Sequence, residues 1–114
     1  MFVTVWKFVV RPERVDEFER HYGPDGTWAA LFRKAPGYVR TELFRGDHHE
    51  YITIDYWENA DAYRDFRERC VAEYDALDAE MQGLTEREEA IASLSQPSNS
   101  ATQQLSNPNT MPPA

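Results

Sequence analysis

Two segments carry large apolar side chains on both faces of an extended strand, and this feature most constrains how the chain can fold. The segments Phe2–Val10 and Glu50–Trp57 are rich in the β-branched and aromatic residues that favour strands. In the second segment, Ile52, Ile54 and Tyr56 point one way, whereas Tyr51, Thr53, Asp55 and Trp57 point the other. A sheet with one wet face alternates cleanly between apolar and polar residues. These segments do not, so the sequence predicts a sheet that is covered on both faces.

Helical periodicity follows each of these strands. Apolar residues recur at helical spacing over Val15–Tyr22, break at Gly23–Gly26, resume over Trp28–Phe32 and stop at Ala35–Gly37. The first strand ends at Arg11-Pro12, because proline cannot continue a strand ladder but suits the first turn of a helix. One helical region, interrupted in its middle, is therefore expected between the first two strands.

A second helical stripe is longer and unbroken. Asn59 can cap it, because its side-chain oxygen can accept from a free amide of the first turn. At 1.5 Å per residue, a stripe of about 20 residues spans roughly 30 Å. Gly83 is expected to end the helix. The residues at helical spacing are Tyr63, Phe66, Cys70, Tyr74, Leu77 and Met81.

The order of elements predicts the fold class. Tyr38–Arg45 is a further strand, joined to Glu50–Trp57 by a short polar loop typical of a hairpin, and Glu86–Leu94 makes a short final strand. The order β-α-β-β-α-β predicts a ferredoxin-like α+β fold: a four-stranded antiparallel sheet with both helices on one face. The uncovered face would leave an exposed apolar patch, which face-to-face pairing of two sheets removes. We therefore expect a homodimer, with positions such as Trp57 facing the interface.

Composition divides the chain and narrows its partners. Residues 95–114 contain no charged side chain and four of the chain's seven prolines, so we expect a disordered tail after a domain of residues 1–94. The net charge is −8, and the basic residues alternate with acids, which argues against nucleic acid and anionic membranes as partners. With one cysteine, no leader and no apolar run long enough to span a bilayer, a cytoplasmic protein is expected.

Several short motifs resemble those of one family. They are YGPDGTW (22–28), LFRKAPGY (31–38), TEL (41–43), YITIDYW (51–57) and GLTEREE (83–89). Together they resemble the antibiotic-biosynthesis monooxygenase domain, within the dimeric α+β barrel superfamily, over residues 2–94. The chain departs from that pattern at Ala92-Ser93-Leu94, where a glycine before a terminal aromatic residue is common.

The resemblance implies a reaction class. It implies a cofactor-independent monooxygenase that oxidises a small aromatic, phenolic or quinol substrate of polyketide type with O₂, acting as a homodimer without metal or other cofactor. Such chemistry needs a dry aromatic pocket and a group that accepts a proton. Two alternatives stay open: a non-catalytic dimeric ligand-binding or stress-associated domain, and haem binding or degradation, for which His21 is the only plausible iron ligand.

Site residues are expected in the gap between helices and sheet, beside the Gly23–Gly26 break. His21, which precedes the break, is the expected general base, although a surface histidine near a helix end is an equally ordinary reading. The aromatic side chains expected to line the pocket are also consistent with an ordinary hydrophobic core. These side chains are Tyr22, Trp28, Phe32, Tyr63, Phe66 and Tyr74.

The other polar candidates have simpler interpretations. Asp55 and Glu42 are costly to bury unpaired and are expected to bond across the dimer interface, with Arg40 as a partner, rather than to act in catalysis. His48 and His49 lie in the hairpin loop and are expected to be exposed, and no spacing indicates a metal site. Cys70 is expected to be a small core residue.

Overall fold

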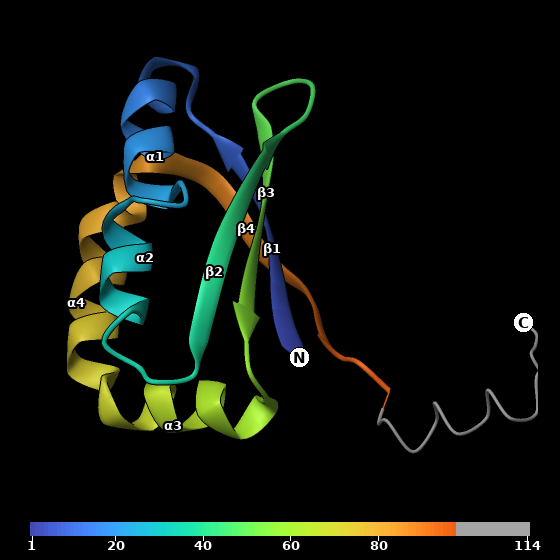
Figure 1. The fold of residues 1–114 in the computed structure, drawn as a ribbon. Helices are drawn as coiled ribbons and strands as arrows, with labels where there is room; N and C mark the ends of the chain where they lie inside the picture. Colours follow the sequence, from blue (N-terminus) through green and yellow to red (C-terminus); the bar gives the residue numbers. More distant parts are fainter. Residues whose placement is uncertain (98–114) are drawn as a thin grey trace, which may run out of the picture.

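The computed structural model describes residues 1–97 and has the expected order of elements (Figure 1). Its four strands form one antiparallel sheet in the order β2-β3-β1-β4, and the helices lie on one side of it. The ferredoxin-like α+β prediction is thereby confirmed. The elements are β1 (Phe2–Val10), a 3-10 turn (Pro12–Arg14), α1 (Val15–Tyr22), α2 (Thr27–Phe32), β2 (Tyr38–Arg45), β3 (Glu50–Trp57), α3 (Ala60–Arg69), α4 (Val71–Met81), a second 3-10 turn (Gln82–Leu84) and β4 (Thr85–Ser95).

The last strand runs slightly further than the sequence predicts. β4 reaches Ser95, and the amide of Gln96 donates to the carbonyl of Met1 at 2.9 Å. The expected tail otherwise lies almost wholly in residues 98–114, which are outside the described residues. None of the helices within residues 1–97 combines the length and apolar character that crossing a bilayer requires.

The two faces of the sheet differ as the strand alternation predicts. In β3, Tyr51, Thr53, Asp55 and Trp57 are buried beneath the helices, and the residues between them are only partly buried. Trp57 is fully buried on this inner face, so the expectation that it faces a dimer interface is wrong. The outer face is open in the single chain (Figure 1). We call it the open sheet face and define it by six residues paired across strands: Val3, Val5, Phe44, Ile52, Ile54 and Leu94.

A close backbone contact makes the break between α1 and α2. The amide of Gly23 closes α1 by donating to Glu19, and Gly26 then begins α2. A Cβ on Gly26 would stand 2.5 Å from the carbonyl oxygen of His21, so only glycine allows the chain to turn this closely against the end of α1. The two short helices therefore lie at different angles over the sheet (Figure 1).

The second helical region is not one straight helix, contrary to the sequence prediction. It divides at Cys70, whose backbone leaves the helical region at φ −111° and ψ 27°. α3 then runs across one end of the domain, and α4 turns to run beside α2 (Figure 1). No proline or glycine marks the position. The cap is as predicted, because the Asn59 side chain accepts from the amide of Ala62 at 2.8 Å.

Candidate active site

A cavity of about 300 Å³ lies between the helices and the inner face of the sheet. Aromatic side chains from β1, α1, α2 and α4 and short polar side chains of β2 and β3 form its walls. Charged groups from α3, α4 and β4 complete it. The lining residues are Trp6, Phe8, Tyr22, Trp28, Phe32, Thr41, Thr53, Asp55, Arg67, Tyr74, Asp75, Asp78 and Glu88.

Four of the six predicted wall residues line this cavity. Tyr22, Trp28, Phe32 and Tyr74 contribute to its surface, and the ring centroids of Trp28 and Tyr74 are 5.0 Å apart. Burial raises the pKa of Tyr74 to about 12 and that of Tyr22 further, so both phenols stay neutral.

The other two predicted wall residues lie behind the first four. Phe66 is buried edge-on against Phe32, with their centroids 5.3 Å apart. Tyr63 packs against Trp57, and its hydroxyl accepts from Arg67 at 3.0 Å. Within residues 1–97, neither is among the residues that line the cavity.

His21 bridges the break between α1 and α2 and does not reach the cavity. Its Nδ1 lies 2.7 Å from the hydroxyl of Thr27, the first residue of α2. It is partly exposed and is not among the lining residues of the described part of the chain. The structure therefore gives His21 a place in joining the two helices and does not bring it to the aromatic walls.

Asp55 is a functional candidate that the sequence analysis assigns to the dimer interface instead. It lines the cavity from β3 and is only 8% exposed. The hydroxyl of Thr41 donates to its Oδ1 at 2.6 Å, and that of Thr4 is 3.5 Å from its Oδ2. Burial raises the pKa of Asp55 to about 6, and the two threonine hydroxyls oppose that rise. The expectation that Asp55 bonds across a dimer interface is wrong, because it faces the helices.

Glu42 and Arg40 lie on the outer side of the sheet and pair with each other. Their charged groups are 3.8 Å apart, and the Arg40 guanidinium stacks 3.8 Å from the ring centroid of Tyr56. The Tyr56 hydroxyl donates to Glu42 at 2.6 Å. The predicted Arg40–Glu42 partnership thus forms within one chain.

The lining is strongly acidic towards α4 and β4. Asp75, Asp78 and Glu88 share this side of the cavity, and Arg67 is the basic residue that lines it. Partial burial, followed by repulsion from Asp78, raises the pKa of Glu88. The Arg67 guanidinium lies 4.0 Å from the ring centroid of Tyr74, where a cation–π contact holds it.

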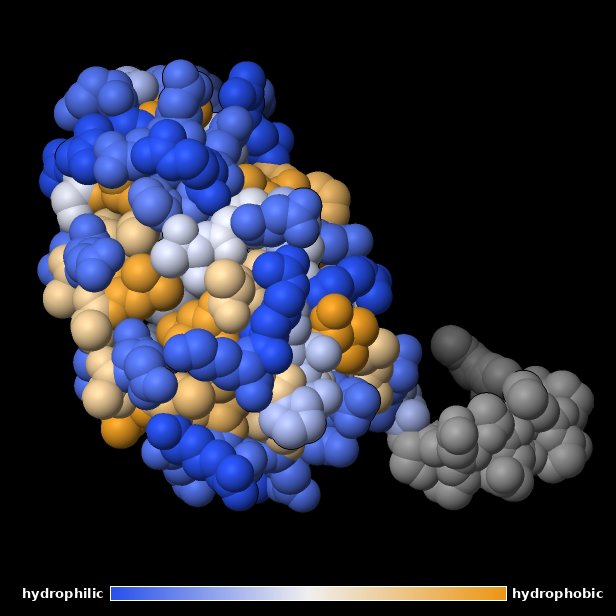
Figure 2. All heavy atoms as spheres, turned by 60° about the vertical axis from the view of Figure 1, so that its left-hand side comes forward, coloured by the Kyte–Doolittle hydropathy of each residue, from blue (hydrophilic) through white to orange (hydrophobic). Residues whose placement is uncertain are grey.

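Figure 2 shows the helical side of the molecule, where hydrophilic side chains predominate and apolar areas interrupt them.

The hairpin-loop histidines, His48 and His49, are exposed and have positive φ values of 57° and 63°. Among residues 1–97, no three His, Cys, Asp or Glu side chains are grouped so that they could hold a metal ion.

Comparisons with known proteins agree with this fold. The family model of antibiotic biosynthesis monooxygenase matches residues 1–72. The solved structure of SnoaB, a cofactor-independent oxygenase from Streptomyces nogalater, is 24% identical, covers 85% of this chain and 93% of its own, and superposes with a TM-score of 0.60. A Bordetella bronchiseptica protein, provisionally named an antibiotic biosynthesis monooxygenase, is 20% identical over 85% of this chain and 97% of its own, with a TM-score of 0.65.

A third similar structure has a different name. A NIPSNAP domain protein from Burkholderia xenovorans, described as uncharacterized, is 14% identical over 86% of this chain and 96% of its own, with a TM-score of 0.61. At these identities the structures support the fold. The comparison with curated proteins gave no match.

The raised pKa of Asp55 predicts a specific dependence of stability on pH. In the folded protein its pKa is about 6, whereas an unfolded chain has an Asp pKa of about 3.9. Between these values the folded state holds a proton that the unfolded state has released, so the unfolding free energy falls as pH rises. Asp55 should therefore cost stability on the order of 3 kcal/mol above pH 6.

Urea unfolding of the native protein and Asp55→Asn, from pH 4 to pH 7.5, measures this cost. The variant should gain stability relative to the native protein as pH rises through that window. The pKa of Glu88 is also raised, so Glu88 lowers the unfolding free energy in the same direction in both proteins. Its contribution therefore cancels in the difference between their unfolding free energies. A constant difference across the window would contradict the prediction.

Proposed function

We propose that this chain, which belongs to the antibiotic biosynthesis monooxygenase family, oxidises a small aromatic phenol, anthrone or quinol with O₂ inside the cavity, without a bound cofactor. The observation that carries the proposal is the placement of Asp55, a carboxyl group with a pKa near 6, in a cavity that six aromatic side chains also line. Apolar cavities with a few polar groups are the usual form of a small-molecule site. The cofactor-independent oxygenase SnoaB has the same fold.

Asp55 is the group that we assign to accept the substrate proton. A general base works best when its pKa lies near the working pH, and at pH 7 a group of pKa about 6 is mostly ionised. The aromatic walls of Trp28, Phe32 and Tyr74 would stack against a flat substrate and exclude water from reactive intermediates. The haem alternative gains no support, because His21 lies outside the cavity.

The reaction balances with O₂ as the only oxidant. A substrate deprotonated by Asp55 transfers one electron to O₂, and the resulting substrate radical and superoxide combine to form a carbon–oxygen bond. The peroxide takes up a proton from solvent and, at an anthrone methylene carbon, loses water. The carbon then keeps one oxygen as a carbonyl group, and two C–H bonds have been lost. The first C–H proton goes through Asp55 to solvent, and the second leaves in the water together with the second oxygen and the proton taken from solvent.

Asp55→Asn should lower turnover by roughly 10²-fold or more, the usual scale for removing a general base. Oxygen uptake by the purified protein with a panel of anthrones and quinols, without added flavin or metal, measures it. His21→Ala is the matched control and should retain native turnover, because His21 contacts Thr27 outside the cavity. If His21→Ala loses activity and Asp55→Asn keeps it, the assignment is reversed.

A protein that binds these aromatics but takes up no oxygen, in its native form, would overturn the oxygenase proposal. That outcome would favour the non-catalytic ligand-binding alternative.

The charges of the lining also favour one kind of substrate. Four carboxyl groups and one guanidinium face the cavity, and the guanidinium is already engaged by Tyr63 and Tyr74. A ligand carboxylate would meet mainly repulsion there. We therefore infer a preference for neutral, hydroxyl-bearing aromatics over their carboxylated analogues.

Matched ligands test this preference without turnover. The neutral 4-ethylphenol should bind more tightly than 3-(4-hydroxyphenyl)propionate, by about fivefold at low salt, as followed by the indole NMR signals of the cavity tryptophans. Glu88→Gln should narrow that gap, whereas Glu86→Gln, a neighbour on β4 that does not line the cavity, should leave it unchanged. Tighter binding of the carboxylate to the native protein would contradict the inference.

We also propose that two chains pair through their open sheet faces to form a homodimer. Exposed or half-exposed apolar side chains gather there, including Phe44 at 51% exposure and Leu94 at 56%. Val5 and Ile54 are neighbours across β1 and β3, and Phe44 and Ile52 across β2 and β3. An apolar face of this extent is usually covered by a partner.

Ile54→Glu should dissociate such a dimer, because it places a charge at the centre of the apolar face. Light scattering at micromolar concentration should give twice the 13.3 kDa chain mass for the native protein and a lower mass for the variant. Val71→Glu replaces an apolar residue on the helical surface, 53% exposed on α4, and should leave the mass unchanged. A native mass of one chain would contradict the proposal.

A further inference from the structure

A β-bulge in β2 places two hydroxyl side chains on the inner face of the sheet. Tyr38 pairs with Trp57 and Arg40 pairs with Tyr56, so Val39 is an extra residue in the strand. In a regular strand, residues three apart point to opposite faces. The bulge brings Tyr38 and Thr41 to the same face, and bulges often re-aim side chains in this way beside active sites.

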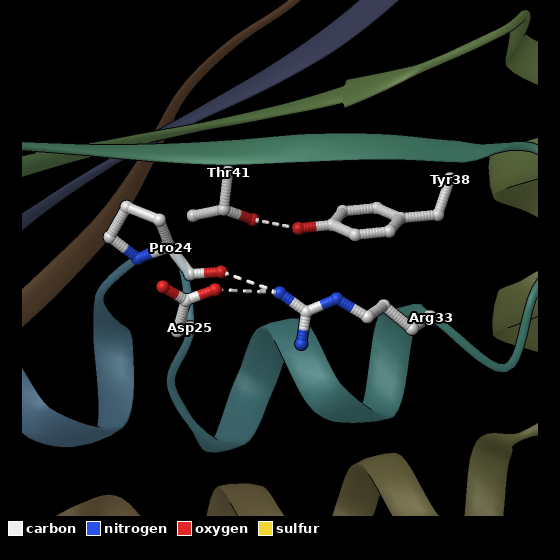
Figure 3. Close-up of polar contacts among 5 residues, drawn as sticks. All are labelled: Pro24, Asp25, Arg33, Tyr38 and Thr41. Carbon is white, nitrogen blue, oxygen red and sulfur yellow. Dashed lines mark hydrogen bonds and ion pairs between the residues drawn. The ribbon is translucent and has the colours of Figure 1, made fainter.

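The two hydroxyls continue the hydrogen bonding of Asp55. The Tyr38 hydroxyl is 2.7 Å from the Thr41 hydroxyl, and Thr41 donates to Asp55 at 2.6 Å. Figure 3 shows the ring of Tyr38 lying along β2 with its hydroxyl directed to Thr41. Thr41 and Asp55 are buried and Tyr38 is partly buried, so the chain of bonds runs from two buried side chains to a partly exposed one.

The direction of these bonds depends on the protonation of Asp55. A carboxylate only accepts, and a threonine hydroxyl has one proton, so Thr41 must donate to ionised Asp55 and Tyr38 must donate to Thr41. Once Asp55 carries a proton, each bond can reverse: Asp55 donates to Thr41, and Thr41 donates to the oxygen of Tyr38. The Tyr38 hydroxyl is then free to donate its own proton outward.

We propose that Thr41 and Tyr38 form a proton relay, which carries the proton accepted by Asp55 out of the cavity and returns Asp55 to its ionised form. The inference rests on the proposed function, because that reaction delivers a proton to Asp55. Within it, Tyr38 and Thr41 are positioning residues that act through Asp55 and do not touch the substrate's reacting atoms. One proton enters at the carboxylate and one leaves from the phenol, so no charge accumulates on the relay.

A charged residue of the α1–α2 turn, Asp25, and one at the end of α2, Arg33, lie near the Tyr38 end of the relay. Arg33 donates from Nη2 to the carbonyl of Pro24 at 2.9 Å and to Asp25 Oδ1 at 3.2 Å, beside Tyr38 and Thr41 (Figure 3). Burial is the largest cause that raises the pKa of Tyr38, and the charges of Asp25 and Arg33 act on it in opposite directions. A phenol that stays neutral suits a relay, because it passes a proton without holding a charge.

Asp55 itself provides a readout that needs no turnover. Because Thr41 donates to the carboxylate, Thr41→Val should raise the pKa of Asp55, and Tyr38→Phe should raise it by less, since Thr41 then loses the donor that polarises it. Thr41→Ser keeps a hydroxyl and should restore the native value. Carbon-13 NMR of the carboxyl groups, with Asp55→Asn for assignment, measures these shifts.

The other ionisable groups facing Asp55 across the cavity are unchanged in every variant and act as a constant background: Tyr22, Arg67, Tyr74, Asp75, Asp78 and Glu88.

Kinetics test the transport step. Tyr38→Phe should lower kcat by about tenfold and leave KM unchanged, with a larger solvent deuterium isotope effect on kcat, because proton release from Asp55 becomes limiting. Tyr56→Phe is the matched control: its hydroxyl also donates to a strand partner, Glu42, but on the outer face. It should show native kinetics and a native Asp55 titration.

Two results would overturn the relay. One is an Asp55 titration that neither Thr41→Val nor Tyr38→Phe alters. The other is native kcat and a native isotope effect in Tyr38→Phe. If the native protein takes up no oxygen, the proposed function fails, and the titration still decides whether Tyr38 and Thr41 control Asp55.

Discussion

Aromatic packing around Phe32 holds the helices to the sheet and thereby sets the shape of everything else. The ring of Phe32 on α2 lies 5.6 Å from Trp57 on β3, 5.3 Å from Phe66 on α3 and 5.6 Å from Tyr38 on β2, measured between ring centroids. One side chain thus joins four elements, and aromatic pairs at these distances add to the stabilisation from burial. The cavity lies beside this packing, and both Phe32 and Trp28 line it.

One row of short side chains on the inner face of the sheet lies beside that space. By strand register, Thr41 on β2, Asp55 on β3 and Thr4 on β1 are successive neighbours in one row across the sheet. Asp55 is therefore flanked by a hydroxyl on each side, and these hydroxyls offset part of the cost of burying a carboxyl group. The row that lies beside the cavity supplies its polar chemistry.

The sequence predicts elements and faces well because both depend on local periodicity. The strand alternation of Tyr51 to Trp57 separates the two faces correctly, and the break at Gly23–Gly26 separates two helices. The bulge at Val39 and the helix break at Cys70 leave no such signal, since neither contains glycine or proline and both depend on tertiary packing.

The same distinction between local periodicity and tertiary packing applies to the residues of the candidate site. Aromatic walls such as Trp28 and Tyr74 follow from helical spacing, whereas the role of Asp55 depends on which face meets the helices and on strand register. An aspartate among apolar strand residues was the available signal, and a polar residue there fits an interface as readily as a cavity. The imidazole ring of His21 favours it as a general base from the sequence, but in the structure its side chain contacts Thr27 outside the cavity.

Asp55 also explains why the fold keeps a feature that lowers its stability. A buried carboxyl group with a pKa near 6 costs free energy at neutral pH, and an apolar residue of similar size would pack against Trp28 and Phe32 without that cost. Strongly shifted ionisable groups concentrate at functional sites, where a proton acceptor near neutrality is needed. Thr4 and Thr41 hold the carboxyl group by hydrogen bonds from neutral hydroxyls. A lysine or arginine partner would instead compensate its negative charge. A strong ion pair would lower the pKa and weaken the base, so support by neutral hydroxyls is the arrangement that keeps Asp55 able both to accept a proton and to release it.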